Sequence, residues 1–215
     1  MLASQENDPR KAGTIWVMDS DQSIPEIAPT IPTEFCQIEL GDVSELASVA
    51  GEDFRQEAFR RLESGRMCYA ARVDGQIVAW GWVSFNEEYV GEVRLFLNLL
   101  PGEAYIWDCI TLPAFRQNHL YSSLLVYIQG ELRKSGVCRT WIGANFDNVA
   151  SQRGIERAGF LRVADLVIDW VFALRMIWVE GYSGVPEKLV AEARRVFLDH
   201  RDHHWLEVSS SFGHT

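Results

Sequence analysis

The sequence predicts a mixed α/β (α+β) fold, in which a mostly antiparallel central sheet carries helices on both faces. Two patterns support this prediction. β-rich runs joined by short turns fill the first half of the chain, and strand–helix–strand units fill the second half. With 215 residues, of which 47% are apolar, the chain can bury one normal globular core.

The predicted strands are β-branched and aromatic runs that end at turn residues. They cover residues 35–40, 67–73, 77–85, 89–100, 103–112, 138–145 and 161–180. The last of these runs is long enough for two strands or one bent strand. Asp74-Gly75 separates the second run from the third, and this dipeptide is typical of a tight hairpin.

The predicted helices follow from apolar spacing and from residues that start or stop a helix. Phe54, Ala58 and Leu62 recur at helical spacing, and Gly65 is a plausible stop. Helices are expected over residues 42–50, 52–65, 118–134, 148–158 and 186–200. The last one has a proline in its first turn, where proline is well tolerated.

These elements divide the chain into three parts. Residues 1–33 hold many prolines and polar residues and are expected to form a loosely ordered N-terminal arm. Residues 34–180 form the α/β domain, and residues 181–215 add a C-terminal helix and tail. We expect a cytoplasmic protein with reduced thiols and no membrane segment, because the start lacks a signal-peptide pattern, no apolar run could span a bilayer, and the four cysteines form no CxxC pair.

The formal net charge of -10 argues against a nucleic acid partner, because a phosphate backbone is bound by basic surfaces. The acidity mildly favours a cationic or amine-bearing partner. The alternative is that the charge serves solubility alone.

Two segments carry the functional prediction. In residues 110–128 (ITLPAFRQNHLYSSLLVYI), a strand, a short loop and a helix meet. The first N–H groups of a helix are unpaired and lie at the positive end of its dipole, so this junction can cradle an anion. Arg116 adds a forked cation that suits a phosphate. In residues 145–160 (NFDNVASQRGIERAGF), Asn148 precedes a short helix that ends at Gly159-Phe160.

Together the two segments resemble the GNAT (N-acetyltransferase) superfamily. The resemblance covers about residues 35–177 and is strongest over residues 106–160. The matching positions are Pro113, Arg116, Leu124 and Leu125 in the first segment, and Asn148, Ser151, Glu156, Arg157, Gly159 and Phe160 in the second. The resemblance implies an enzyme that uses acetyl-CoA or another acyl-CoA as co-substrate and needs no metal.

The pyrophosphate loop departs from the family pattern, Arg-Gly-x-Gly-x-Gly (or Ala). The three glycine positions carry the side chains of Gln117, His119 and Tyr121, which crowd the approach of a phosphate to the backbone. The resemblance assigns phosphate binding to Arg116, Gln117, Asn118, His119, Leu120, Tyr121 and Ser122. Three alternatives stay open: coenzyme A binds in a shifted way, another acyl carrier is used, or binding has been lost.

The resemblance also places the acyl group where the strand at 103–112 splays from the strand at 138–145. Cys109, Ile110 and Thr111 would lie beside it, and the Ile110 N–H would polarise the thioester carbonyl as an oxyanion-hole donor. Asn148 and Ser151 would lie near the pantetheine arm or the departing sulfur.

A base must accept the proton of the attacking amine, and the candidates are Glu92, Glu103 and Asp108. Glu92 is expected on a strand that faces the substrate cleft. Asp108 lies in an apolar strand where desolvation would favour its neutral form, or it is a hydrogen-bonded structural carboxylate. The family's usual tyrosine acid is replaced by Ile155, so Tyr105 or Tyr121 could serve, or the thiolate leaves unassisted.

The remaining candidates have simpler explanations. Cys109 could act as a nucleophile, but a buried thiol without a neighbouring histidine is usually inert. The spacing of His200, His203 and His204 fits a metal clamp and, more commonly, a solvated surface. The tryptophans Trp80, Trp82 and Trp107 could floor the substrate cleft or fill the core.

The sequence therefore predicts an acyltransferase that moves an acetyl (or other acyl) group from acyl-CoA to the primary amine of a small molecule or peptide by direct attack. One alternative is an acyltransferase for long-chain or carrier-protein-bound acyl groups. Others are a non-catalytic binding module that has lost coenzyme A binding, and a hydrolase that uses Cys109. Residues 161–180 could also pair with a second copy to form a homodimer.

Overall fold

The computed structural model describes residues 10–171 and 174–198 of the chain. Its strands are β1 (Arg10–Asp19), β2 (Glu34–Ile38), β3 (Met67–Val73), β4 (Gln76–Ser84), β5 (Glu87–Val90), β6 (Leu95–Asn98), β7 (Glu103–Thr111), β8 (Arg139–Asn145), β9 (Leu161–Val171) and β10 (Leu174–Gly181). Its α-helices are α1 (Val43–Ala50), α2 (Arg55–Glu63), α3 (Leu120–Lys134), α4 (Val149–Arg157) and α5 (Glu187–Phe197).

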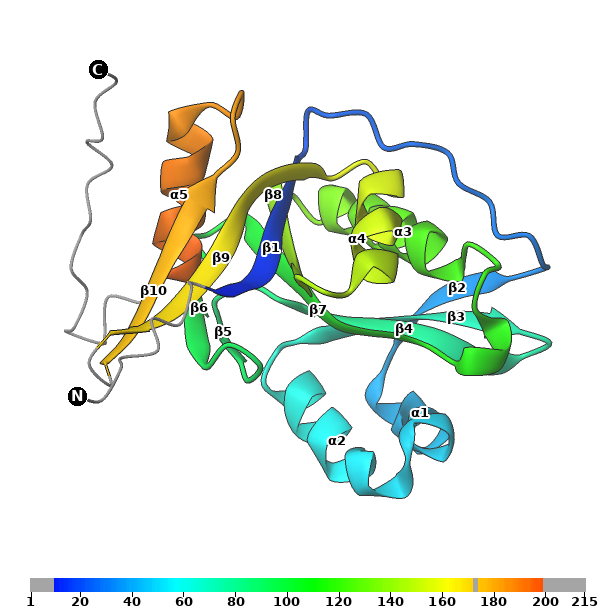
Figure 1. Ribbon diagram of the computed structural model, residues 1–215. Helices are drawn as coiled ribbons and strands as arrows, with labels where there is room; N and C mark the ends of the chain where they lie inside the picture. Colours follow the sequence, from blue (N-terminus) through cyan, green and yellow to red (C-terminus); the bar gives the residue numbers. More distant parts are fainter. Residues whose placement is uncertain (1–9, 172–173, 199–215) are drawn as a thin grey trace, which may run out of the picture.

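Eight strands form one sheet in the order β10-β9-β1-β8-β7-β4-β3-β2. All neighbours in it are antiparallel except β7 and β8. Helices α3 and α4 lie on one face, and α1 and α2 lie on the other (Figure 1). The predicted fold class is therefore confirmed, as are the hairpin at Asp74-Gly75, where both residues have positive φ, and the two-strand reading of residues 161–180.

The predicted loose arm is wrong over residues 10–19, which form β1 inside the sheet. β1 pairs with β8 on one side and with β9 on the other. Its side chains alternate between the two faces: Ile15 and Val17 pack on one side, Trp16 and Met18 on the other, and all four are at most 3% exposed. The strand completes the core, although the strands that it pairs with come more than a hundred residues later in the chain.

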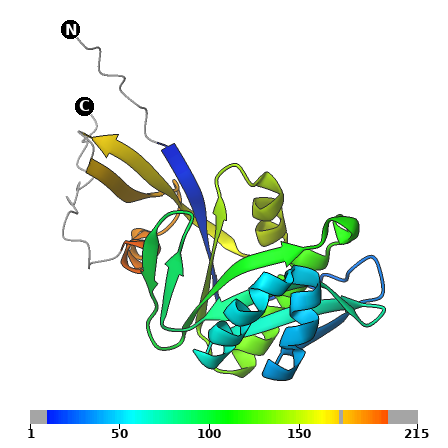
Figure 2. The same ribbon diagram turned by 90° about the horizontal axis from the view of Figure 1, so that it is seen from below.

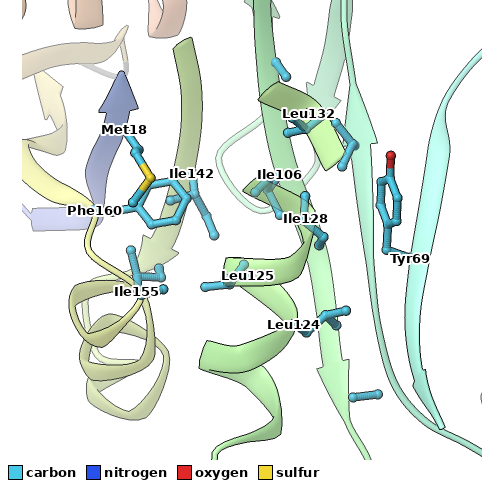
Figure 3. Packing of buried hydrophobic residues seen from close by; sticks show 14 of the residues in the cluster. Met18, Tyr69, Ile106, Leu124, Leu125, Ile128, Leu132, Ile142, Ile155 and Phe160 are labelled. Atoms are coloured by element: carbon cyan, nitrogen blue, oxygen red, sulfur yellow. The ribbon is translucent and has the colours of Figure 1, made fainter. Parts of the chain in front are cut away.

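The face under α3 and α4 holds a continuous apolar cluster. Leu125 of α3 and Ile155 of α4 meet Ile142 of β8, with Met18 and Phe160 beside them (Figure 3). This packing fixes the starts of both helices against the sheet. The phosphate-binding loop predicted from the sequence lies at one of these starts.

The opposite face is covered by α1 and α2 at one end and by α5 at the other. α5 belongs to the same body as the sheet, since Val190, Ala193, Val196 and Phe197 are buried against it. Arg195 of α5 also pairs with the buried Glu103 of β7 at 2.5 Å, so Glu103 has a structural role.

Residues 89–100, predicted as one strand-like segment, belong to a separate hairpin of β5 and β6 that stands over this second face. Three arginines hold the hairpin. Arg66 pairs with Glu88 of β5 at 2.6 Å, Arg195 donates to the Asn98 carbonyl of β6, and Arg175 donates to the Val93 carbonyl in the turn. Among the described residues, no helix is long and apolar enough to cross a membrane.

The central position of β1 leads to a stability prediction. Truncating the buried Ile15 to alanine removes apolar packing on the face of the sheet that it shares with Val17, and such changes cost about 2–5 kcal/mol. Urea unfolding followed by circular dichroism should show this loss for Ile15→Ala. The exposed Asp21→Ala serves as the matched control and should change stability little. An unchanged midpoint for Ile15→Ala would contradict the placement of β1.

Candidate functional site

The site is built where β7 and β8 part. The two strands pair in parallel from Glu103↔Arg139 to Ile106↔Ile142, and no further pair joins them. Both strands nevertheless continue, β7 to Thr111 and β8 to Asn145, and Figure 2 shows them diverging. The splay between these two strands that the resemblance implied is therefore present.

A bulge in β7 accounts for the divergence. Asp108 has a φ of 46°, and the pairing of β7 with β4 shifts register between Trp80 and Trp82, opposite this residue. Such an irregularity bends a strand and increases its local twist. β7 stays paired with β4 beyond the bulge, so it is the pairing with β8 that ends.

The bulge also decides which amides face the gap. The Leu112 N–H donates to the Val78 carbonyl on the β4 side. Because N–H groups alternate along a strand, the Ile110 N–H also points toward β4, and the amides of Cys109 and Thr111 point toward β8. The geometry therefore favours Cys109 and Thr111, rather than Ile110, as backbone donors in the gap.

Asp108 is not the desolvated carboxylate expected from the sequence. Its Oδ2 accepts from Arg61 Nη1 at 2.5 Å, and its side chain is 30% exposed. The Arg61 guanidinium lies 4.3 Å from the ring centre of Trp107 and 5.0 Å from those of Phe54 and Trp82. The alternative of a structural, hydrogen-bonded carboxylate fits these contacts, since the aromatic cage fixes the arginine that holds the bulge.

A cleft of about 530 Å³ opens at the gap on the face opposite α3 and α4. Its lining comes from β1, the β5–β6 turn, β7, β8, β9 and α5, and includes Asp108, Tyr105 and Trp107. Glu92 also lines it, but from the turn between β5 and β6 and not from a strand. Within the described part of the chain, Glu92 makes no hydrogen bond or ion pair.

Two side chains of β7 flank the gap. The Tyr105 hydroxyl reaches across to Gly143 of β8, where a Cβ would lie only 3.3 Å away, so glycine leaves it room. Burial raises the pKa of Tyr105, and the phenol stays protonated at neutral pH. Burial likewise raises the pKa of Cys109, whose thiol packs against Gly81; the geometry therefore does not support Cys109 as a nucleophile.

On the other face, two non-glycine residues of the predicted phosphate loop adopt the backbone conformation that favours glycine. Gln117 and His119 have φ of 69° and 59°, the left-handed region, at the first two of the three positions where the family has glycine. This conformation costs about 1–2 kcal/mol for a residue with a Cβ. Asn118 offsets part of it: its Oδ1 accepts from Thr30 at 2.8 Å and its Nδ2 donates to the Phe115 carbonyl.

The amides of this loop are available. No acceptor for the N–H groups of residues 117–122 is found within the described ranges, and α3 has no side-chain cap. Arg116 is exposed; its Nε donates to the Thr111 carbonyl at 3.3 Å, and its guanidinium has no carboxylate partner among the described residues. Free donors at the start of a fifteen-residue helix can hold an anion.

Tyr121, at the third family-glycine position, fills the space between α3 and α4. A Cβ on Gly154 of α4 would lie 2.4 Å from its ring, and its Oη lies 3.1 Å from Ser151 Oγ. Burial raises the pKa of Tyr121, and the nearby Cys109 raises it further. The phenol therefore stands between the loop and the gap.

Asn148 and Ser151, predicted to lie near the pantetheine arm, both have partners in the protein. Asn148 Oδ1 accepts from the Ser151 N–H at 3.0 Å and caps α4, and the Ser151 hydroxyl meets Tyr121. Their positions beside Tyr121 keep them next to the gap.

Sequence reasoning missed the residues that fix the cleft wall. The Trp107 Nε1 donates to Ser84 Oγ at 2.9 Å, Ser84 donates to the buried Glu88, and Arg66 pairs with Glu88. These partners lie on different elements, so no local pattern links them. Of the tryptophans proposed for the cleft, Trp107 lines it, whereas Trp80 and Trp82 are buried in the core.

No group of three or more His, Cys, Asp or Glu side chains that could hold a metal occurs among the residues that the structure describes. His200, His203 and His204 lie outside those residues.

The fold and the site define a split-sheet α/β domain with a helix-start anion cradle beside the split. Residues 34–160 match the model of the acetyltransferase (GNAT) family. This match covers more than half of the chain, and the chain therefore belongs to that family. The match ends before β9 and does not include β1.

One solved structure shows the same fold, and others are similar to parts of this chain. An acetyltransferase of the GNAT family from Colwellia psychrerythraea aligns with a TM-score of 0.57 at 12% identity, over 82% of this chain and 58% of its own. A putative GNAT acetyltransferase from Novosphingobium aromaticivorans aligns with a TM-score of 0.46 at 16% identity, over 70% of this chain and 60% of its own. The aminoglycoside 6'-N-acetyltransferase AAC(6')-Ih from Acinetobacter baumannii aligns with a TM-score of 0.48 at 17% identity, over 60% of this chain and 91% of its own. The chain thus spans less than two thirds of the first two structures, and a comparison with curated proteins found no match.

The left-handed loop leads to a second prediction. Glycine adopts this conformation without strain, so Gln117→Gly and His119→Gly should each raise the free energy of unfolding by about 1 kcal/mol, net of glycine's entropy cost. Alanine at either position keeps a Cβ and should bring no such gain. Urea unfolding of the four variants measures this. Equal stabilities for the glycine and alanine variants would contradict the loop conformation.

Proposed function

We propose that the chain is an N-acyltransferase that moves an acetyl (or other acyl) group from acyl-CoA to a primary amine by direct attack. One observation carries the proposal: a loop of free amides on one face of the sheet leads to a gap between β7 and β8, and the gap opens into a cleft on the other face. Membership of the acetyltransferase (GNAT) family supports it.

In this proposal the co-substrate lies on the α3 side of the sheet. Arg116 and the amides of residues 117–122 hold the pyrophosphate with charge-assisted hydrogen bonds. The N–H groups of Cys109 and Thr111 face the gap and bind the end of the pantetheine arm, much as a strand would pair with β7. The thioester then points toward the cleft, where the amine binds.

The chemistry is one acyl transfer. The amine nitrogen attacks the thioester carbonyl, the Cys109 N–H stabilises the oxyanion, and the C–S bond breaks as the amide forms. Glu92 accepts the proton lost by the nitrogen, directly or through water, because it is the cleft carboxylate without a partner among the described residues. The departing thiolate receives a proton from Tyr121 or Tyr105, both of which burial keeps protonated.

A second function has one observation in its favour. The Tyr121 ring closes the space between α3 and α4, through which the pantetheine arm would pass. A chain in which this ring cannot move would be a binding module with the fold of the family and no transferase activity. Longer acyl groups, or acyl groups bound to a carrier protein, would use the same gap. Comparing thioesters of different chain length and carrier distinguishes these donors from acetyl-CoA.

Binding of acetyl-CoA tests the proposed function. At 100 times its dissociation constant, the ligand should stabilise the fold by about 2.7 kcal/mol and raise the melting temperature. Arg116→Ala removes one charge-assisted bond and should weaken binding about tenfold. Lys188→Ala removes an exposed cation from α5 and is the matched control. If acetyl-CoA and longer acyl-CoA thioesters all leave the melting temperature unchanged, the proposal fails in favour of the binding module.

Substitutions of Tyr121 test the route of the co-substrate. Binding requires the ring to leave Ser151, which costs a hydrogen bond worth about 1 kcal/mol, so Tyr121→Ala should bind coenzyme A about fivefold more tightly in calorimetry. Tyr121→Phe keeps the ring and loses the hydroxyl. If Tyr121 is the acid, Tyr121→Phe should lower kcat and leave KM for the amine unchanged, whereas Tyr105→Phe should not. Weaker coenzyme A binding by Tyr121→Ala would show that the ring is a contact and not an obstacle.

A further inference from the structure

The cleft on the acceptor face has a lining that selects among amines. Glu92 contributes the one carboxylate in the lining that has no partner among the described residues, because Asp108 is bound to Arg61. Arg61 in turn is shared between Asp108 at 2.5 Å and Glu57 at 2.9 Å, and its side chain is 14% exposed. The cleft therefore presents net negative charge, which attracts an ammonium group and repels an anionic acceptor.

Most of the other lining side chains are apolar or aromatic. They include Tyr89, Val90, Val93, Trp107 and Ala144. Tyr89 is 47% exposed, and its ring centre lies 4.9 Å from that of Phe96 at a tilt of 46°, so an aromatic surface is exposed beside the cleft. A hydrated sugar or polyamine would gain little from such walls, whereas an apolar group would be removed from water.

These walls are held in place before any ligand binds. The hairpin that carries Tyr89, Val90 and Val93 is tied to the body by Arg66, Arg175 and Arg195. A preformed wall reduces the entropy lost on binding. The volume of about 530 Å³ lies within the range of small-molecule sites.

Part of this lining belongs to segments outside the family match at residues 34–160. Ile15 comes from β1, Leu166 from β9 and Phe197 from α5. These three side chains are at most 4% exposed, so the segments outside the family match support the apolar part of the cleft from beneath.

We infer that the acceptor is a primary amine carried on an aromatic or branched apolar body, with its ammonium group near Glu92. This inference rests on the proposed function and names the substrate class of the same cleft. Polyamines and amino sugars are the classes that the lining disfavours.

The test measures binding of amines without acyl-CoA, by calorimetry on the full chain. Along the series from ethylamine to hexylamine, each methylene buried in the cleft should tighten binding about fourfold until the cleft is full. 2-Phenylethylamine should bind more tightly than spermidine or glucosamine. A flat series, or tighter binding of spermidine or glucosamine, would overturn the inference.

Two variants with matched controls assign the effect to the cleft. Val93→Thr keeps the side-chain shape and replaces a methyl with a hydroxyl. It should weaken the binding of 2-phenylethylamine several-fold and leave the binding of ethylamine unchanged. Val149→Thr, at an exposed position on α4, is its control. Glu92→Gln should reduce the preference for 2-phenylethylamine over 2-phenylethanol about three- to fivefold, the size typical of a partly exposed ion pair. Glu26→Gln removes one charge in the segment before β2 and should change nothing.

The readouts separate the two proposals. Amine binding that follows the series in a chain that never transfers an acyl group would sink the proposed function and leave the cleft as an amine-binding site only. Acyl transfer with a flat series, or with no effect of Val93→Thr and Glu92→Gln, would sink the inference alone.

Discussion

The loss of pairing between β7 and β8 is the feature on which the rest of the site depends. A continuous ladder would close the sheet and separate its two faces. Arg61, inside a cage of three aromatic rings, pairs with Asp108 at the bulge. The bulge bends β7 away from β8, while β7 stays paired with β4. A co-substrate on one face can then meet an acceptor on the other, which is what a direct transfer between two bound molecules requires.

The pyrophosphate loop has a backbone conformation that favours glycine, although residues with side chains occupy it. Gln117 and His119 occupy the left-handed region that glycine would occupy without strain. The cost is local, and Asn118 and its bond to Thr30 help to hold the turn. The third replacement acts differently, because Tyr121 changes the space between α3 and α4 rather than the backbone. Strain at a functional loop is tolerated where the surrounding structure fixes it.

Local patterns predicted most of the fold and only part of the site. The hairpin at Asp74-Gly75 and the helices have signals within a few residues, and the loop of residues 116–122 was found by its strand–loop–helix order. β1 was missed because its two partners lie far along the chain and its neighbours looked like a polar leader. The contact of Arg61 with Asp108 joins α2 to β7, and the bulge in β7 forms in that tertiary context. No local sequence pattern indicates either the contact or the bulge, so the direction of the Ile110 amide could not be predicted.

In the proposed complex, amides of β7 and of the loop before α3 bind one co-substrate together. Proton–nitrogen correlation spectra during titration with a stable thioether analogue of acetyl-CoA would detect this binding at each amide. We expect saturable shifts of the Cys109, Thr111 and residue 117–122 amides with a single dissociation constant, and a small response of Ile110. Saturating ligand that leaves the amides of Cys109 and residues 117–122 unmoved would contradict it.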